Sequence, residues 1–375
     1  MKKKVLLVIR WPVGGIRTYI RYVYRTLQAE KWQTTIVAPA TDEMRVLLED
    51  LAGMNVQYLH TKENPFITSF TLQIFRELMR NSYDLVHSHG FTSGICAAMP
   101  ARLIRIKHLV TSHDVIRQNQ FSGLRGKLKK KLMGALLSLP AIIQSVSYDA
   151  QQNLLENFPS LGKHGKCIVI RNGIEVDRFY DASPRDFRTE LGLQEDVFLI
   201  GFLGRFMPQK GFRYLVDSID ILRKEKSLPK RPLVLTFGDG GFIREEKLAI
   251  RERRLENYFC FMPFASNAAG IIKGLDVVAM PSLWEACPLQ PMEVLICGTP
   301  FIGTDCVGLR EVLQGTPATV IPKADASALA RALRRIMEFD RKSEFMGFRK
   351  TAVQRFDVTK TSESLLKLYK KLADF

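Results

Sequence analysis

The sequence has few cysteines, and they are widely scattered. Its 375 residues include six cysteines, and no two of them form a C-x-x-C pair. Structural zinc sites and disulfide frameworks use cysteines at close, recurring spacings. The sequence therefore argues against a zinc cage or a disulfide-stapled fold, and it predicts a protein of the reducing cytoplasm.

Long hydrophobic runs are also missing. The apolar run at the start extends only from Val5 to Ile9, and the longest one near the middle, residues 132–143, contains Pro140. A membrane-spanning helix needs about 20 apolar residues, and a signal peptide needs an apolar core of about 7–15 residues. We therefore expect the first run to be a β-strand and the protein to be neither secreted nor membrane-spanning.

Acidic residues are scarcer than basic ones, most of all in the first half. The net charge is +17; residues 1–180 carry a net +12 and residues 181–375 a net +5. We therefore expect the first half to face an anionic partner. Charge alone would also suit a nucleic-acid-binding protein. However, no basic segment is interleaved with aromatics that could stack on bases, so we expect no nucleic acid partner.

Short apolar runs alternate with longer amphipathic stretches along the whole chain. Seven runs in the first half and five in the second are candidate strands, among them KVLLVIR, DLVHSHG, VFLIGFLG and DVVAMPS. Many lack polar alternation, which is typical of parallel strands covered on both faces. So many strands exceed the usual width of one open sheet. The sequence therefore predicts an α/β protein with two Rossmann-like, doubly wound domains.

The junction between these domains is expected near Phe179. The segment after it, YDASPRDF, is polar and contains a proline, as linkers do. This places an N-terminal domain at 1–178 and a C-terminal domain at 179–355. Leu365, Leu368 and Leu372 lie at helical spacing. They predict a helix within 356–375 that closes the N-terminal domain.

Two strand-to-helix turns are candidates for binding an anion. In IRWPVGGIRTYI, Gly14 and Gly15 would let the backbone and a helix N-terminus approach a ligand. In GFLGRFMPQKGF, Arg205 and Lys210 follow a buried strand five positions apart, so both cations can reach one diphosphate. No P-loop consensus is present. The alternatives are an ordinary glycine turn and two solvated surface charges.

Glu285 and Glu293 stand in the apolar stretch PSLWEACPLQPMEVLICGTPFIG, where a carboxylate is costly to bury without a partner. A helix is expected to begin near Pro288 or Leu289 and to end at Gly298. Glu285 would then project from the preceding loop and Glu293 from the first turn. The N–H groups there can hold an anion or hydroxyls. Alternatively, Glu293 only compensates the helix dipole and Glu285 is a surface residue.

Together, and in this order, these motifs resemble the retaining glycosyltransferases of family 4, whose GT-B fold has two Rossmann-like domains facing across a cleft. VGGIRTYI is similar to the family's glycine loop, VIRNGIEVDRF to its interdomain signature, GRFMPQKG to its G-R-x-x-x-x-K-G and EACPLQPME to its E-x7-E. The resemblance covers nearly the whole chain. It implies transfer of a sugar, with retention, from a nucleotide-diphosphate sugar to an envelope polysaccharide or lipid-linked acceptor. An epimerase or hydrolase acting on nucleotide sugars is the alternative.

The resemblance also implies roles for single residues. Glu285 would bind hydroxyls of the donor sugar, as a catalytic residue, and Glu293 would bind the ribose. The diphosphate would contact Arg205 and Lys210, helped by backbone groups near Gly15, Pro288 and Leu289. Because the chain has no D-x-D pair, fixed cations are expected to stabilise the leaving diphosphate. No metal or other cofactor is expected.

Histidines end two of the predicted strands. His113, in LVTSHD, occupies the position of a family histidine that contacts the donor sugar, and it is the second catalytic candidate. Gly14, His89 and Asp114 are candidates for the acceptor side. His87 is expected to be a hydrogen-bonded framework residue.

Basic and apolar residues interleave between Ile116 and Leu137. Leu128, Leu132 and Leu136 repeat at helical spacing among basic residues that include Arg125, Lys127, Lys129, Lys130 and Lys131. A basic amphipathic helix can lie on an anionic bilayer. It would bring a lipid-linked acceptor to a cytoplasmic enzyme at the inner face of the plasma membrane. The alternative is a helix whose leucines pack on the sheet.

Overall fold

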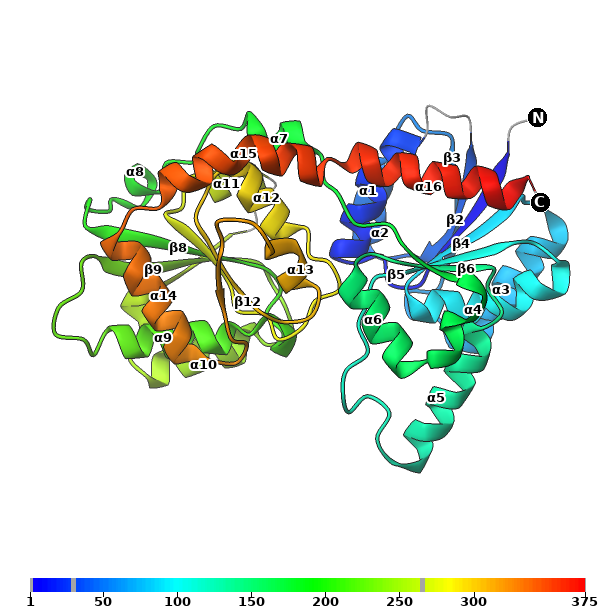
Figure 1. Cartoon of the computed structure of the whole chain (residues 1–375), viewed down its shortest axis with the longest axis horizontal. Coiled ribbons are helices and arrows are strands. Elements are labelled where there is room, and N and C mark those ends of the chain that lie inside the picture. The colour runs from blue at the N-terminus through cyan, green and yellow to red at the C-terminus, as the bar shows by residue number, and fades with distance from the viewer. Residues whose placement is uncertain (1–2, 28–31, 264–266, 375) are drawn as a thin grey trace. The chain divides into compact units, whose positions relative to one another are not determined.

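The chain forms two compact units in a computed structural model that describes residues 3–27, 32–263 and 267–374 (Figure 1). The first unit comprises Met1–Ile174 with Val358–Phe375, and the second comprises Glu175–Asp357. The division therefore lies ahead of the junction expected near Phe179. The reason is that Phe179 is buried within α7 (Val176–Tyr180), which packs on α12 (Gln290–Cys297) of the second unit.

The sheet of the first unit has seven parallel strands in the order β3-β2-β1-β4-β5-β6-β7. β4 and β5 are entirely buried, as their unbroken apolar runs predict for strands covered by helices on both faces. The strands are β1 (Lys4–Ile9), β2 (Gln33–Pro39), β3 (Val56–Thr61), β4 (Leu85–His89), β5 (His108–Ser112), β6 (Ile142–Ser145) and β7 (Cys167–Val169). The helices are α1 (Gly15–Leu27), α2 (Asp42–Asp50), α3 (Ile67–Arg80), α4 (Phe91–Ile104), α5 (Gly123–Leu137), α6 (Tyr148–Asn157), the 3₁₀ helix η2 (Pro159–Gly165) and α16 (Val358–Ala373).

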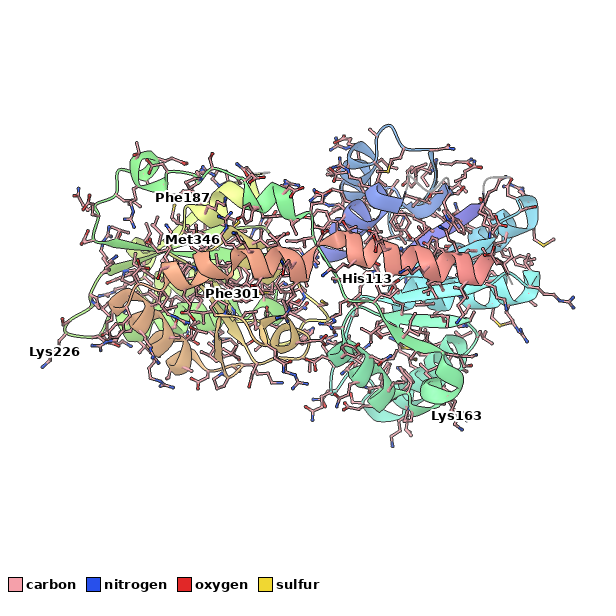
Figure 2. The ribbon with its side chains drawn as sticks, turned by 45° about the horizontal axis from the view of Figure 1, so that its top comes forward. His113, Lys163, Phe187, Lys226, Phe301 and Met346 are labelled. Carbon is pink, nitrogen blue, oxygen red and sulfur yellow. The ribbon has the colours of Figure 1, made fainter. Side chains whose placement is uncertain are left out.

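The second unit contains a six-stranded parallel sheet in the order β10-β9-β8-β11-β12-β13. Phe187 and Phe301, labelled in Figure 2, are among its largest fully buried side chains. The strands are β8 (Val197–Leu203), β9 (Arg231–Phe237), β10 (Phe259–Met262), β11 (Val277–Met280), β12 (Phe301–Thr304) and β13 (Thr319–Ile321). Its helices, besides α7 and α12, are α8 (Phe187–Leu191), η3 (Pro208–Lys210), α9 (Phe212–Leu222), α10 (Ile243–Glu252), η4 (Glu256–Tyr258), α11 (Ala268–Lys273), α13 (Leu309–Leu313), α14 (Ala326–Glu338) and α15 (Lys342–Phe356).

These two parallel sheets confirm the predicted fold class. Each of the twelve candidate strands corresponds to an observed one, whereas β13 was not predicted. β13 is an edge strand of three residues, two of which are not buried. It therefore lacks the unbroken apolar run that marks the central strands.

In each unit the order of strands reverses once, between β1 and β4 in the first sheet and between β8 and β11 in the second. Ligands of doubly wound folds bind beyond the carboxyl ends of the strands at such a reversal. The loops that leave β8 and β11 contain residues 204–211 and 281–289. The topology therefore brings two motifs, separated by about eighty residues of sequence, to one edge of the second sheet.

The last helix, α16, belongs to the first unit. Leu365, Leu368, Tyr369 and Leu372 form part of its buried face, and the helix packs on α1 and β4. The C-terminal helix thus completes the hydrophobic core of the unit that also contains the N-terminal strand and helix. None of the helices in the described part of the chain is long and apolar enough to cross a bilayer.

Candidate functional site

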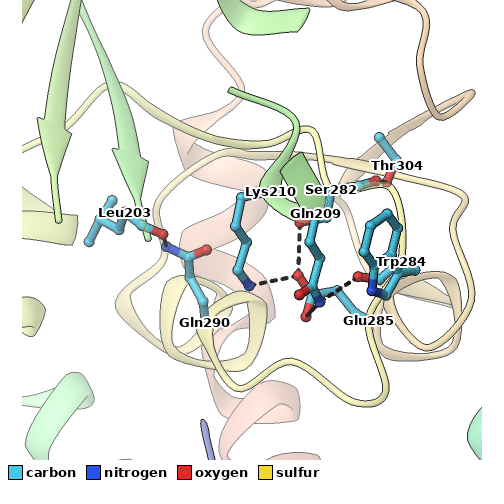
Figure 3. Close-up of polar contacts among 8 residues, drawn as sticks. All are labelled: Leu203, Gln209, Lys210, Ser282, Trp284, Glu285, Gln290 and Thr304. Carbon is cyan, nitrogen blue, oxygen red and sulfur yellow. Dashed lines mark hydrogen bonds and ion pairs between the residues drawn. The ribbon is translucent and has the colours of Figure 1, made fainter. Parts of the chain in front are cut away.

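An ion pair occupies the edge of the second sheet at the strand reversal. The Nζ atom of Lys210 lies 2.7 Å from Oε1 of Glu285 (Figure 3). Glu285 is buried, with 7% of its surface exposed. The ammonium group compensates a carboxylate that would otherwise be costly to bury. Lys210 is thus the partner that allows a carboxylate to be buried in the apolar stretch around Glu285.

Two further residues hold the Glu285 loop. The hydroxyl of Ser282 donates to Oε1 of Glu285 at 2.9 Å, and the side-chain amide of Gln209 donates to the carbonyl of Trp284 at 2.8 Å. In turn, the hydroxyl of Thr304 donates to the carbonyl of Ser282 (Figure 3). The carboxylate is therefore oriented from both neighbouring loops, and among the described residues its Oε2 has only a long 3.5 Å contact, with Nε2 of Gln209.

Helix α12 is tied to the end of β8 by Gln290, whose side-chain amide donates to the carbonyl of Leu203 at 2.7 Å (Figure 3). Leu289 is its N-cap residue, no side chain of the described residues caps it, and Gly298 ends it in the left-handed conformation. Glu293 lies half-buried in the first turn, as predicted from the sequence. Pro288, just before the N-cap, is buried.

Arg205 differs from Lys210 in having no partner among the described residues. Its side chain is exposed, and no described residue forms a hydrogen bond or ion pair with its guanidinium group. Arginine forms two parallel hydrogen bonds with phosphate oxygens, and it keeps its charge in all ordinary conditions. Arg205 is thus available to an anion at the same strand end that holds Lys210.

Two glycines allow the loops to approach each other. Gly211 has a φ of 65°, and a Cβ atom added to it would lie 2.0 Å from the carbonyl oxygen of Pro281. Gly308 has a φ of 78°, and a Cβ atom there would lie 2.4 Å from the carbonyl oxygen of Glu285. Any side chain at either position would displace the loop that carries Glu285.

In the first unit, the glycine turn lies at the carboxyl end of β1. Gly14 has a φ of 55°, and Gly15 begins α1, where an added Cβ atom would meet nothing within 4 Å. Gly90 follows β4, and a Cβ atom on it would lie 3.9 Å both from Asp114 and from Ile16. The exits of β1, β4 and β5 are therefore close together, and Asp114 is exposed there.

Three histidines of the first unit, His87, His89 and His113, form one cluster. His87 Nδ1 lies 2.6 Å from the hydroxyl of Tyr369, and His87 Nε2 lies 2.6 Å from that of Thr111. His89 Nδ1 lies 3.0 Å from Nε2 of His113. Burial lowers the pKa of His113 to about 3, and it also keeps the pKa values of His87 and His89 well below 6.5. All three imidazoles are therefore neutral at pH 7.

The cluster changes the role assigned to His89. This residue is buried, and both of its ring nitrogens contact side chains of the cluster, so it has no surface to offer an acceptor. His87 is a framework residue, in agreement with the sequence. His113, labelled in Figure 2, is half-buried and ends the cluster on the side of the loop after β5.

Helix α5 presents leucines to solvent. Leu124, Leu128 and Leu132 are 86%, 70% and 59% exposed, so they do not pack on the sheet. The neighbouring Arg125, Lys127, Lys129 and Lys131 are exposed as well. Lys130 differs, because its ammonium group donates to the side chain of Asn157 at 3.1 Å.

Two family models match the chain and together cover most of it. The model described as Glycosyltransferase Family 4 matches residues 13–178, and the model described as Glycosyl transferases group 1 matches residues 197–338. The chain belongs to glycosyltransferase family 4. The resemblance inferred from the motifs is confirmed, and this family 4 member is a glycosyltransferase.

The curated relatives of this glycosyltransferase have low sequence identity to it but match most of its length. The D-inositol 3-phosphate glycosyltransferase of Corynebacterium jeikeium is 26% identical, over 96% of this chain and 92% of that protein. The UDP-Gal:alpha-D-GlcNAc-diphosphoundecaprenol alpha-1,3-galactosyltransferase of Escherichia coli is 24% identical, over 80% of this chain and 78% of that protein. Among solved structures, Anabaena Alr3699/HepE in complex with UDP-glucose has a TM-score of 0.84 at 19% identity, covering 98% of this chain and 99% of that one. This last similarity shows the shared fold.

Sequence reasoning missed the residues that orient Glu285 in this glycosyltransferase. Gln209, Ser282, Gln290 and Thr304 are common polar residues, and no spacing distinguishes them from surface residues. Only Ser282 could have been singled out from the sequence, because it follows a buried strand and precedes Glu285 by three positions. The pairing of Lys210 with Glu285 was also not predicted, because both were assigned to different parts of a donor.

The ion pair leads to a prediction on stability. Lys210→Met removes the cation and leaves the Glu285 carboxylate buried without its partner. The second unit should lose about 1–3 kcal/mol of unfolding free energy, measured by urea denaturation. Adding Glu285→Gln should recover most of the loss, since a neutral amide is less costly to bury. Lys226→Met, at an exposed lysine of the same unit labelled in Figure 2, should have no effect. Equal stability of Lys210→Met and wild type would contradict this account of the pair.

Proposed function

We propose that the second unit binds a nucleotide-diphosphate sugar at the edge formed by the loops after β8 and β11. The observation that carries this proposal is the Lys210–Glu285 pair at the strand reversal, with Arg205, which pairs with no described residue, on the same loop as Lys210. The solved structure of Anabaena Alr3699/HepE, which has the same fold, contains UDP-glucose. Its fold supports a donor of this class.

Each charged group has a part in this proposal. Arg205 binds the diphosphate, and Lys210 adds the N–H donors that Glu285 does not use, since an ammonium group has three. Glu285 uses its less occupied Oε2 to accept hydrogen bonds from hydroxyls of the donor sugar. Glu293, in the first turn of α12, accepts hydrogen bonds from the ribose. Backbone groups near Pro288 and Leu289 complete the diphosphate site on the second unit.

We further propose that the reaction retains the anomeric configuration and needs no metal. Departure of the diphosphate leaves negative charge on its oxygens and positive charge on the anomeric carbon. Arg205, Lys210 and the N-terminus of α12 are fixed positive groups for the first charge. A carboxylate at Glu285 suits the second charge. In the first unit, His113 binds a sugar hydroxyl of the substrate, and Asp114 is the candidate base for the acceptor.

For the acceptor, we propose a lipid-linked or envelope glycan reached at an anionic membrane surface. The relative from Escherichia coli is named for a diphosphoundecaprenol acceptor. In this chain, three exposed leucines of α5 lie among four exposed cations, so the helix offers both apolar side chains and positive charge to an anionic bilayer surface. Attraction to anionic lipids contributes about 1 kcal/mol for each basic residue near the surface.

A binding panel tests the donor proposal. Isothermal calorimetry with UDP, GDP, ADP and TDP should find at least one diphosphate that binds. For it, Arg205→Ala should raise Kd about tenfold, because a charge-assisted hydrogen bond is lost. Lys226→Ala removes a similar charge beyond the end of α9 and should leave Kd unchanged. Unchanged Kd in Arg205→Ala for every diphosphate would rule out its assigned role.

A second experiment addresses the chemistry. With the donor found in the panel, EDTA should leave turnover intact, and NMR of the product should show the anomeric configuration of the donor. Glu285→Gln should lower kcat at least a hundredfold, in line with the loss of one electrostatic contact to the reacting centre. Inactivation by EDTA with recovery on adding Mg²⁺ would refute the metal-free mechanism, and an inverted product would refute retention.

Sedimentation with liposomes tests the membrane proposal. The wild-type protein should sediment with vesicles that contain phosphatidylglycerol at low salt and much less at 0.5 M salt, about a 4 Å Debye length. Reversing Lys127, Lys129 and Lys131 to Glu should weaken binding. The matched control reverses Lys360, Lys367 and Lys371, which are exposed on α16, where the neighbouring leucines Leu365, Leu368 and Leu372 are buried. Equal loss in both variants would mean that net charge, rather than α5, determines attachment.

A further inference from the structure

A continuous chain of hydrogen-bonding side chains crosses the core of the first unit and ends at His113. We call it the histidine relay. In order, it consists of Gln144, Thr111, His87, the tyrosine pair Tyr24 and Tyr369, His89 and His113. All but His113 are fully or nearly fully buried. Because neighbouring members contact each other directly, at 2.6–3.3 Å, each proton in the chain is supplied by one member to the next.

The direction of the relay is determined at Gln144. Its side-chain nitrogen lies 3.0 Å from the carbonyl oxygen of Ile170 and 3.3 Å from that of Ser145. Only the NH₂ group can donate to carbonyls, so Oε1 faces Thr111. The Thr111 hydroxyl donates to this oxygen at 2.6 Å. Its own oxygen then accepts from His87 at 2.6 Å, so that His87 carries its proton on Nε2.

The tyrosine pair transmits this direction. Nδ1 of His87 is left with a lone pair, and it lies 2.6 Å from the Tyr369 hydroxyl and 2.9 Å from that of Tyr24. The two hydroxyl oxygens are 2.6 Å apart, so one proton must lie between them. The second hydroxyl proton goes to His87. Whichever tyrosine supplies it, no hydroxyl proton remains for His89.

His89 therefore donates from Nε2 to the Tyr24 oxygen, at 3.3 Å. Its Nδ1 then has a lone pair and must accept from Nε2–H of His113, 3.0 Å away. Nδ1 of His113 is left as an acceptor, and no described residue forms a hydrogen bond with it. All three imidazoles are neutral, because burial keeps the pKa values of His87, His89 and His113 well below 6.5.

We propose that the histidine relay holds His113 as the Nε2–H tautomer and so makes Nδ1 a hydrogen-bond acceptor for a substrate hydroxyl. Gln144, Thr111 and Tyr24 are then positioning residues for this enzyme. The inference rests on the proposed function, in which His113 binds a sugar hydroxyl of the substrate. It adds that the sugar group at this position must donate a hydrogen bond, which a carboxylate of a uronic acid cannot do.

Because each hydrogen bond in the relay determines the direction of the next, a change at Gln144 should move the proton of His113 to its other ring nitrogen. Gln144→Leu removes the acceptor of the Thr111 hydroxyl. That hydroxyl can then donate to His87 Nε2, and each later step reverses until His113 carries its proton on Nδ1. Without the reversal, the Thr111 hydroxyl proton would remain buried and unpaired, which is costly.

The test is long-range ¹H–¹⁵N correlation NMR on the full chain labelled at its histidine rings, with His113 assigned from a His113→Asn sample. In the wild type, His113 should show a protonated, pyrrole-type Nε2 and an unprotonated, pyridine-type Nδ1. Gln144→Leu should exchange the two shifts and lower kcat/KM about tenfold, as expected for one lost hydrogen bond. Ser88→Ala removes the partner of His108, a buried histidine outside the relay, and should leave His113 unchanged.

A wild-type His113 protonated on Nδ1 would overturn the proposal, and so would a Gln144→Leu spectrum with the wild-type tautomer. If Gln144→Leu does not fold, Tyr24→Phe takes its place. It removes the only partner of His89 Nε2 in the relay, so His113 should become a mixture of both tautomers, and a single wild-type tautomer would overturn the proposal. Failure of the proposed function is distinct: His113→Ala would then retain full kcat/KM, whatever the spectra show.

Discussion

All thirteen strands of the two sheets run parallel to their neighbours, and this constraint determines where chemistry can occur. Parallel strands end at a common edge, and the reversal of strand order separates the loops at one point of that edge. In the second unit, this point joins Lys210 to Glu285 across about seventy-five residues of sequence. In the first unit, it joins the glycine turn after β1 to Gly90 after β4. The central strands are buried along their length, so polar groups with access to ligands lie at the strand ends.

The two units handle buried polarity differently. The second unit buries a full negative charge and compensates it with a cation and a hydroxyl, which leaves a charged, oriented site. The first unit buries histidines in the neutral state and compensates them with hydroxyls and an amide. A charged pair can stabilise charge that develops during a reaction. A neutral chain instead determines which atom of its last member carries a proton. The two arrangements are therefore suited to different tasks, leaving-group stabilisation and recognition of a hydroxyl.

The C-terminal helix contributes one member of the histidine relay. α16 supplies Tyr369, whose hydroxyl contacts both Tyr24 and His87. Loss of the helix would therefore expose the core and also remove one of the two hydroxyl groups of the tyrosine pair. Packing and polar order depend on the same residue here, because a tyrosine ring fills the space beside Trp32 while its hydroxyl reaches the histidines.

The sequence by itself determined the fold class, the twelve main strands and the family. Unbroken apolar runs indicate strands buried on both faces, and the spacing of Arg205, Lys210, Glu285 and Glu293 is specific in combination. Tertiary structure alone decided which groups meet. The sequence assigned Lys210 and Glu285 to separate parts of a donor, yet they form an ion pair, and it assigned His89 to the acceptor side, yet it is buried. Partners such as Gln144 and Tyr369 leave no mark in a sequence, because a hydrogen bond depends on the distance between two side chains that only the folded sheet brings together.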